Sequence, residues 1–343
     1  MRNIPSNRLL SVTLVFIVLV FCSSQPGSAQ QTPLPLGLDN NYMVTGDYVV
    51  GGWSKTAGSI TIPDPEAYPA NMAQQVPPGA DIVAAFLYWQ TVENSGTYQG
   101  QNGSFRGYPI TGTILGNLNA PVSWSSGGCA GSSQGSKTIV TYRADVSNLI
   151  PLDSNGNVIQ GNTNPYPVSL PDTGKAGQPP YTLGATLVII YRLLAPTVPL
   201  NAVIIYDGSY APSNTSQTMT QPMLGIFQAG NDQSAAIATR ITHIVGNGQS
   251  NKMQSVYLNT VNLPSLYGAL PPFPGTYNGS WDNPTWFPSN AVNAKDASAT
   301  TSVVPASTNK GCVSWGAIIL STTVQDSDHD GIIDVWKTKQ LDP

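Results

Sequence analysis

Apolar residues along this chain gather in short runs that are rich in Val, Ile, Thr and aromatic residues, and each run is bounded by Gly, Pro, Asn or Asp. Runs of this composition and length predict β-strands. The predicted strands are residues 47–53, 58–62, 81–92, 137–143, 185–194, 201–208, 235–245 and 313–324. Apolar residues are continuous in these runs, so we expect strands that are covered on both faces or closely packed sheets.

Signals for helices are almost absent, and long polar segments separate the strands. Asp145 is placed to cap one short turn that Pro151 ends, and the last segment can form another. The longest connections, rich in Gly, Ser, Asn and Pro, are residues 94–108, 151–182, 208–222 and 264–310. Loops of this length often carry binding surface. We therefore predict an all-β fold, an antiparallel jelly-roll-type β-sandwich over residues 30–322, followed by an acidic tail over residues 323–343.

The first 29 residues have the pattern of a signal peptide. Arg2 and Arg8 precede an apolar run at 9–21 that is short for a membrane span, and Gly27-Ser28-Ala29 fits a cleavage site. Cys22 leaves a lipid-anchored cysteine as the alternative, although the bulky Phe21 precedes it. We expect a secreted or cell-surface bacterial protein with no membrane span after cleavage.

Charge is scarce and mildly acidic. Removing Arg2 and Arg8 with the leader leaves 12 of the 14 basic residues against 18 acidic ones, a net charge near −6. Charged residues make up 9% of the chain, whereas about 25% is usual for soluble domains. No basic stripe is visible, which argues against a nucleic-acid partner.

Two cysteines, Cys129 and Cys312, follow the signal peptide. In an oxidising compartment we expect them to form a disulfide. Two separate thiols remain the alternative, because no spacing pattern supports the pairing.

The final segment, DSDHDGIIDVWK at 326–337, has carboxylates at alternate positions and a glycine that permits a sharp turn. Hard Ca²⁺ takes six to eight oxygen ligands from such a turn. The predicted ligands are Asp326, Asp328, Asp330, Asp334 and the carbonyl of Ile332. A solvated acidic turn without an ion is the alternative, and His329 at an intervening position is not expected to bind a transition metal.

This segment resembles the calcium repeats of thrombospondin type 3 and dockerin-like modules, which follow the pattern D-x-D-x-D-G-x-x-D-x-x-E. Asp326, Asp328, Asp330, Gly331 and Asp334 match that pattern. Lys337 stands where those repeats carry a glutamate, so the resemblance implies a calcium site with one ligand fewer and an added positive charge.

Three strand-rich runs carry a second resemblance: AAFLYWQTVE at 84–93, TIVTYRADVSNLI at 138–150 and LGATLVIIYRLLAPTVPLNAVIIYDGSY at 183–210. Together they are similar to a domain of uncharacterised function in bacterial and archaeal secreted and surface proteins. The resemblance implies a β-rich extracellular module and supplies no catalytic residues.

Candidate catalytic groups are few. His243 lies in a strand pattern where a hydrogen-bonded or exposed histidine is more common than a catalytic one. Glu66 and Glu93 are the only glutamates, and we expect both at the surface unless the fold brings them together. We therefore expect no enzyme, and no catalytic residue is assigned.

Aromatic residues crowd the segment 266–290, among prolines and asparagines. Tyr277, Trp281 and Trp286 are candidates for stacking on sugars, and the alternative is that they close one end of the sandwich as core residues. We expect a non-enzymatic adhesion, matrix or structural protein that contacts extracellular matrix, a surface polymer or a glycan. A carbohydrate-binding module or glycan-active protein using the aromatic segment is the alternative.

Overall fold

Almost all of the regular structure is β-strand, as the sequence predicts, and neighbouring strands are antiparallel except for β3 (Ala67–Tyr68) and β18 (Thr285–Trp286). The computed structural model describes residues 34–55, 58–64, 66–68, 74–94, 96–116, 122–123, 137–160, 166–175, 177–195, 197–212, 218–227, 230, 237–267, 271–305 and 313–340. These belong to one unit, Leu34–Pro343. The expected signal peptide at 1–29 and the expected pair Cys129 and Cys312 lie outside the described residues.

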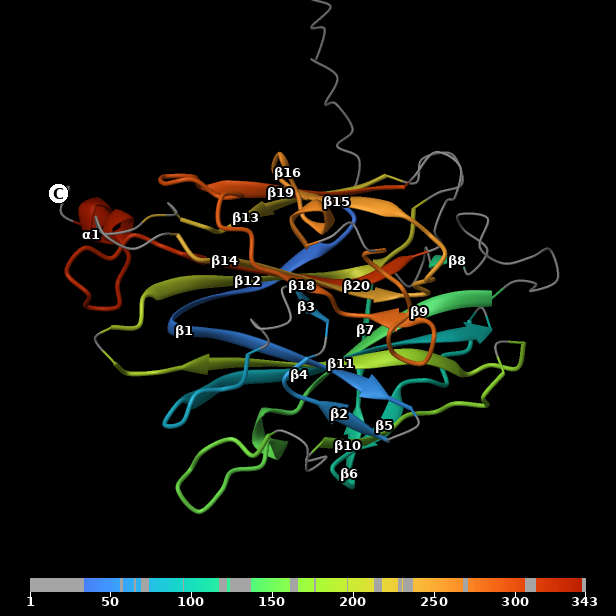
Figure 1. Cartoon of the computed structure of the whole chain (residues 1–343). Coiled ribbons are helices and arrows are strands. Elements are labelled where there is room, and N and C mark those ends of the chain that lie inside the picture. Colours follow the sequence, from blue (N-terminus) through green and yellow to red (C-terminus); the bar gives the residue numbers. More distant parts are fainter. Residues whose placement is uncertain are drawn as a thin grey trace, which may run out of the picture. The chain divides into compact units, whose positions relative to one another are not determined.

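The strands form stacked layers (Figure 1). Layer A consists of β3, β18, β17 (Trp281–Asp282), β14 (Thr239–Gly246), β20 (Ser314–Thr323) and β12 (Leu200–Tyr210). Layer B consists of β11 (Tyr181–Arg192), β4 (Asp81–Asn94), β9 (Lys137–Asp145), β7 (Thr113–Leu115) and β8 (Val122–Ser123). A small separate sheet has the order β13 (Met219–Leu224), β19 (Ser298–Pro305), β15 (Gln254–Leu258) and β16 (Val261–Asn262). Short pairings link β2 (Ser59–Thr61), β10 (Tyr166–Ser169), β5 (Asn102–Phe105) and β6 (Tyr108–Thr111).

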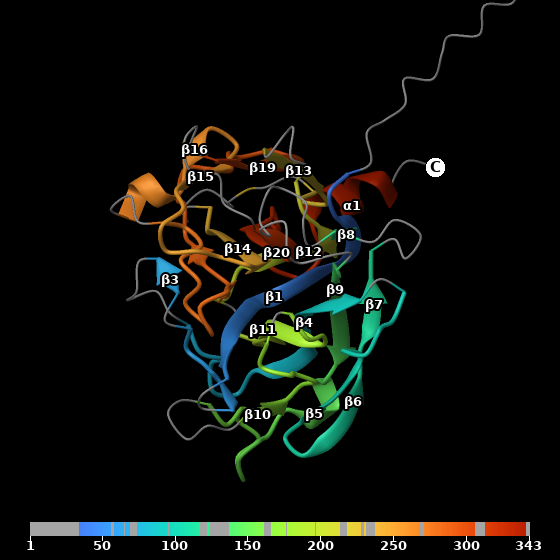
Figure 2. The ribbon, with the colours of Figure 1, turned by 90° about the vertical axis from the view of Figure 1, so that its right-hand side faces the viewer.

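One long strand, β1 (Gly37–Ser54), belongs to both layers (Figure 2). Its residues 37–45 pair with β12, and its residues 46–52 pair with β11. Gly46 stands where the partner changes, and a Cβ there would lie 2.2 Å from the carbonyl oxygen of Tyr191. Glycine therefore allows the strand to pass from layer A to layer B. Strands that switch between packed sheets often bend at such a glycine.

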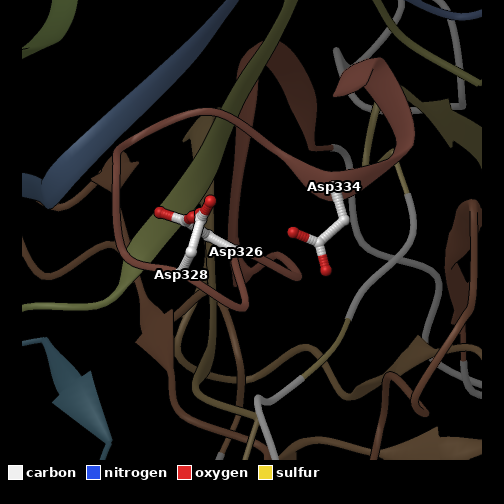
Figure 3. A group of neighbouring side chains, drawn as sticks. All are labelled: Asp326, Asp328 and Asp334. Carbon is white, nitrogen blue, oxygen red and sulfur yellow. The ribbon is translucent and has the colours of Figure 1, made fainter. Parts of the chain in front are cut away.

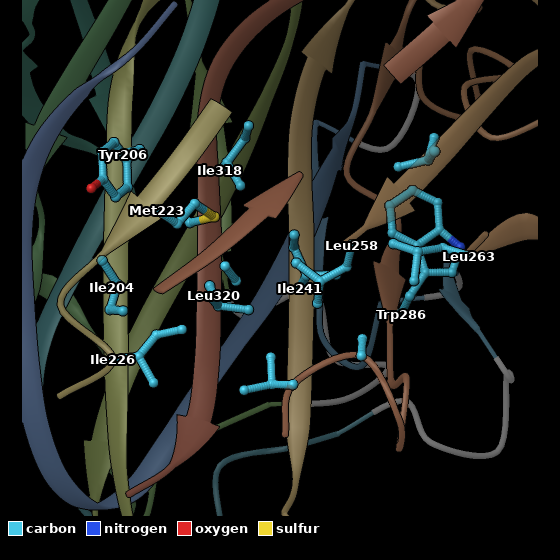
Figure 4. Packing of buried hydrophobic residues seen from close by; sticks show 14 of the residues in the cluster. Ile204, Tyr206, Met223, Ile226, Ile241, Leu258, Leu263, Trp286, Ile318 and Leu320 are labelled. Carbon is cyan, nitrogen blue, oxygen red and sulfur yellow. The ribbon is translucent and has the colours of Figure 1, made fainter. Parts of the chain in front are cut away.

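The described residues form three hydrophobic cores on the faces of these layers. The first core lies between the small sheet and layer A (Figure 4), the second between layers A and B, and the third on the other face of layer B. Along β12, Ile204 belongs to the first core and Ile205 to the second. Along β11, Ile190 belongs to the second core and Ile189 to the third. Burial on both faces explains the continuous apolar runs, as expected. The antiparallel sandwich is confirmed, and its jelly-roll connectivity stays a prediction.

Helical structure is limited to short segments among the described residues. The 3-10 turn η3 (Ser147–Leu149) begins where Asp145 Oδ1 accepts a 2.9 Å hydrogen bond from the Ser147 N–H. A second turn, η4, spans Pro264–Tyr267, and the helix α1 spans Asp334–Gln340. In the part of the chain that the structure describes, no helix has the length and apolarity to cross a membrane.

The segment 264–310, expected to be a polar loop, contains β17, β18 and β19. Strand β19 buries Ala299, Thr301 and Val303 and leaves the residues between them partly exposed. The expectation was wrong because this strand, with the sequence SATTSVVP, covers the core with only one face. Its buried face closes the first core.

Candidate functional site

The acidic loop, residues 326–334, folds back on itself through hydrogen bonds from its own backbone. Asp326 Oδ2 accepts a 2.9 Å bond from the Gly331 N–H, and Asp330 Oδ1 accepts one of 2.9 Å from the Ile332 N–H. Gly331 has a φ of 82° and His329 a φ of 56°. The glycine therefore permits the sharp turn that the sequence predicted. The carbonyl of Ile332 as a ligand stays a prediction.

Three of the predicted ligands approach one another. One carboxylate oxygen each from Asp326, Asp328 and Asp334 lies within 4.8 Å of the other two (Figure 3). Asp326 is 6% exposed, and its Oδ1 is buried and accepts no hydrogen bond. Asp334 accepts a 3.0 Å bond from the Ser327 N–H. The loop thus gathers oxygen ligands at one place, and the most buried of them has an oxygen available.

Lys337 reaches into this group of carboxylates from α1. Its Nζ lies 2.9 Å from Asp330 Oδ1 and 3.5 Å from Asp326 Oδ1. It also forms an ion pair with Asp328 and lies 3.9 Å from Asp334 Oδ1. The hydrogen bond from Lys337 lowers the pKa of Asp328. The positive charge that the sequence placed near the loop is therefore directed at its carboxylates.

The loop is attached to the β unit by apolar contacts. Ile333 is 1% exposed and belongs to the first core, and Val335 packs against the same core. The ring of Trp336 makes an edge contact with Phe227, at 5.7 Å between centroids. The acidic loop therefore lies between the end of β20 and an anchored helix.

The aromatic candidates Tyr277, Trp281 and Trp286 lie in the core, with exposed fractions of 5%, 0% and 1%. Trp281 Nε1 donates a 2.9 Å bond to Thr186 Oγ1, and Tyr277 Oη donates a 2.8 Å bond to Asp64 Oδ1. A buried ring has no free face on which a sugar can stack. These three residues are therefore not assigned to a ligand site, and the core alternative accounts for their positions.

The fit of Trp281 depends on a glycine in layer B. The pairing of β11 with β4 shifts register between Thr182 and Gly184. A Cβ on Gly184 would lie 2.3 Å from Cγ of Trp281. The indole thus occupies the space that a side chain at Gly184 would fill, in the second core.

A cluster of buried carboxyl groups lies beside these rings. Asp64, Glu66 and Asp282 are 4%, 2% and 0% exposed, so the expectation of Glu66 at the surface was wrong. The Asn283 N–H donates a 2.5 Å bond to Glu66 Oε2, and the Asn283 side-chain amide donates to Asp64. Asp282 accepts bonds from the N–H groups of Gly275 and Thr276, at 2.8 Å each to Oδ1. Donors from the folded backbone explain why these acids can be buried.

Burial raises the pKa of each carboxyl in the cluster, of Asp64 to about 7, of Asp282 to about 6, and of Glu66 well above its ordinary range. Among the described residues no lysine or arginine forms an ion pair with any of the three. Like charges in a desolvated site cannot all ionise, and a hydrogen bond joins Glu66 to Asp282. Burial and mutual repulsion therefore favour the protonated forms of these carboxyls.

The space next to this cluster is small. Asp64, Tyr48, Thr285 and Arg240 border a cavity of about 20 Å³. A volume of this size accommodates about one water molecule. The cavity therefore has no room for a sugar or another organic substrate.

Glu93 and His243 are also buried. Glu93 is 1% exposed, which corrects its expected surface position, and it accepts hydrogen bonds from the hydroxyls of Thr91 and Tyr142. Trp315 Nε1 donates a 3.2 Å bond to His243 Nδ1, so the proton is on Nε2, 3.1 Å from Thr301 Oγ1. Burial lowers the pKa of His243 to about 3. This histidine is therefore a neutral, hydrogen-bonded strand residue.

Comparisons of the chain with protein-family models, curated proteins and solved structures gave no match. Of the two carboxylate groups, the buried cluster is enclosed by the fold, whereas Asp328 and Asp330 in the acidic loop are open to solvent, with side chains 62% and 45% exposed. The acidic loop is the candidate site.

Proposed function

We propose that this chain is a secreted or surface-displayed β protein with an adhesive or structural role, in which the C-terminal loop binds a calcium ion. The observation that carries the proposal is the approach of Asp326, Asp328 and Asp334 within one loop. Ile333 attaches the same loop to the first core. An ion at this place would couple the tail to the β unit.

Calcium suits the donor set because every candidate ligand is an oxygen. Asp326, Asp328, Asp330 and Asp334 would hold the ion, and the carbonyl of Ile332 would add a neutral ligand. The buried Asp326 Oδ1, which accepts no hydrogen bond, would gain a partner. Calcium sites of extracellular modules have dissociation constants of about 10⁻⁴ to 10⁻³ M, and we expect this site in that range.

The adhesive or structural role rests on composition and architecture. Charged residues make up 9% of the chain, and three cores hold the layers together. Glu66, Glu93 and His243 are buried and engaged in structural hydrogen bonds. A surface polymer, glycan or matrix component remains the proposed class of partner.

Calcium titration by calorimetry tests the site. The wild-type protein is expected to bind about one ion per chain, and a variant with Asp328→Asn and Asp330→Asn to bind at least about tenfold more weakly, because two anionic ligands become neutral. Both side chains are exposed, so these changes leave the cores intact. A second variant, with Asp81→Asn and Asp153→Asn, removes the same charge from exposed positions elsewhere and should bind like the wild type. No binding at millimolar calcium would contradict the proposal.

A further inference from the structure

The Lys337 ammonium group already occupies the place where the acidic loop would hold a cation. Its distances to Asp330 Oδ1 and Asp326 Oδ1 are 2.9 and 3.5 Å, and it also pairs with Asp328. These are three separate carboxylates that converge on one positive group. The buried oxygen of Asp326 accepts no hydrogen bond and is directed at the same place.

A calcium ion and this ammonium group cannot share the loop. Calcium lies about 2.3 to 2.6 Å from its oxygen ligands. An ion bound by Asp326, Asp328 and Asp334 would lie within a few ångströms of Nζ, because Nζ forms ion pairs with all three carboxylates. Two positive charges at such a distance repel strongly in a partly desolvated site. Occupation by calcium therefore requires that the ammonium group of Lys337 leaves.

The structure allows this exchange with little other movement. The Lys337 side chain is 26% exposed, so its flexible stem can carry the charge into solvent. The helix that bears it has its own attachments, through Val335 against the first core and through the contact of Trp336 with Phe227. The lysine side chain can leave while α1 remains in place.

We propose that Lys337 is an internal cation that competes with calcium for the acidic loop, so that the loop has a lysine-bound and a calcium-bound state. This inference rests on the proposed calcium site and adds its regulation. In low calcium the ammonium group neutralises part of the acidic charge and keeps the loop closed. In high calcium the metal replaces it, and the lysine becomes free to contact a partner.

The test is calcium calorimetry on Lys337→Met, which removes the charge and keeps an unbranched side chain of similar length. We expect calcium to bind about tenfold or more tightly than to the wild type, because no internal cation has to be displaced. Lys337→Arg keeps the positive charge and should bind calcium as weakly as the wild type. Lys175→Met makes the same charge change at an exposed position outside the loop and should bind like the wild type.

A second measurement follows the loop without calcium. In EGTA, limited proteolysis should cleave the tail of Lys337→Met faster than that of the wild type, and calcium should restore its resistance. Lys337→Gln replaces the methionine variant if that protein does not fold. Equal calcium affinity in the wild type and Lys337→Met would overturn the competition and leave the calcium site standing. Absence of binding in every variant, including Lys337→Met, would overturn both.

Discussion

Replacing Trp281 with alanine is expected to lower the free energy of unfolding by about 3 to 5 kcal/mol. The indole is fully buried in the second core, and Gly184 leaves the space that it fills. Its removal leaves a cavity and deprives Thr186 Oγ1 of the 2.9 Å bond from Nε1. Urea unfolding, monitored by circular dichroism, measures this difference in the free energy of unfolding. A shift of the urea midpoint without a change in the denaturant dependence (the m-value) reports the loss of stability.

Trp336→Ala is the matched control, because its side chain lies on α1 and is 44% exposed. Its loss should change the free energy of unfolding by about 1 kcal/mol or less. A Trp281→Ala protein that keeps full stability but loses retention on a polysaccharide would contradict the core assignment. It would return Trp281 to the group of ligand-binding candidates.

The second large effect concerns pH. The free energy of unfolding is expected to fall as pH rises from about 4 to about 7, because burial raises the pKa of Asp64 from its ordinary value of 3.8 to about 7. Between these values the folded protein holds a proton that the unfolded chain has released. The stabilisation is fully present below about pH 4 and is lost as the pH rises through about 7, the pKa of Asp64 in the folded protein. For Asp64 alone, a difference of roughly three between the two pKa values corresponds to about 4 kcal/mol.

Urea midpoints between pH 4.5 and 8 measure this dependence. Asp64→Asn should reduce this fall in the free energy of unfolding without abolishing it, because burial also raises the pKa of Asp282 and of Asp207, each to about 6, and raises that of Glu66. Below pH 6.5 the lowered pKa of His243 has the opposite effect, because it makes the free energy of unfolding rise with pH. This contribution is the same in Asp64→Asn and in the wild type, so the comparison of the two proteins removes it. Asp81→Asn, at an exposed position, should keep the wild-type profile. An identical pH profile in Asp64→Asn would contradict a protonated cluster.

Much of the β architecture follows from local pattern. Strands β4, β11, β12 and β20 appear where continuous apolar runs predict them, because their residues face a core on each side. The first ten residues of β1 were missed, since the sequence GLDNNYMVTG is polar at most positions and its outer part is exposed. Strand β19 was missed for a similar reason. Strands with only one covered face have a weaker signal in a chain that is rich in Ser, Thr and Asn.

The acidic loop was predictable because its ligands are neighbours in the sequence. The buried carboxyl cluster was not, because Asn283 meets Asp64 across 219 positions of the chain. Its only local signals are the short segments PDPE at 63–66 and WDN at 281–283. Composition favours exposed carboxylates, and burial here depends on donors such as the N–H groups of Gly275 and Thr276, which the fold alone supplies.

Strand β1 has a mechanical consequence. Its first half is hydrogen-bonded to β12 and its second half to β11, both antiparallel. Ladder bonds run perpendicular to their strands, so tension along β1 loads them together in shear instead of opening them one at a time. A pull on the amino end of this strand would thus be resisted by two ladders at once.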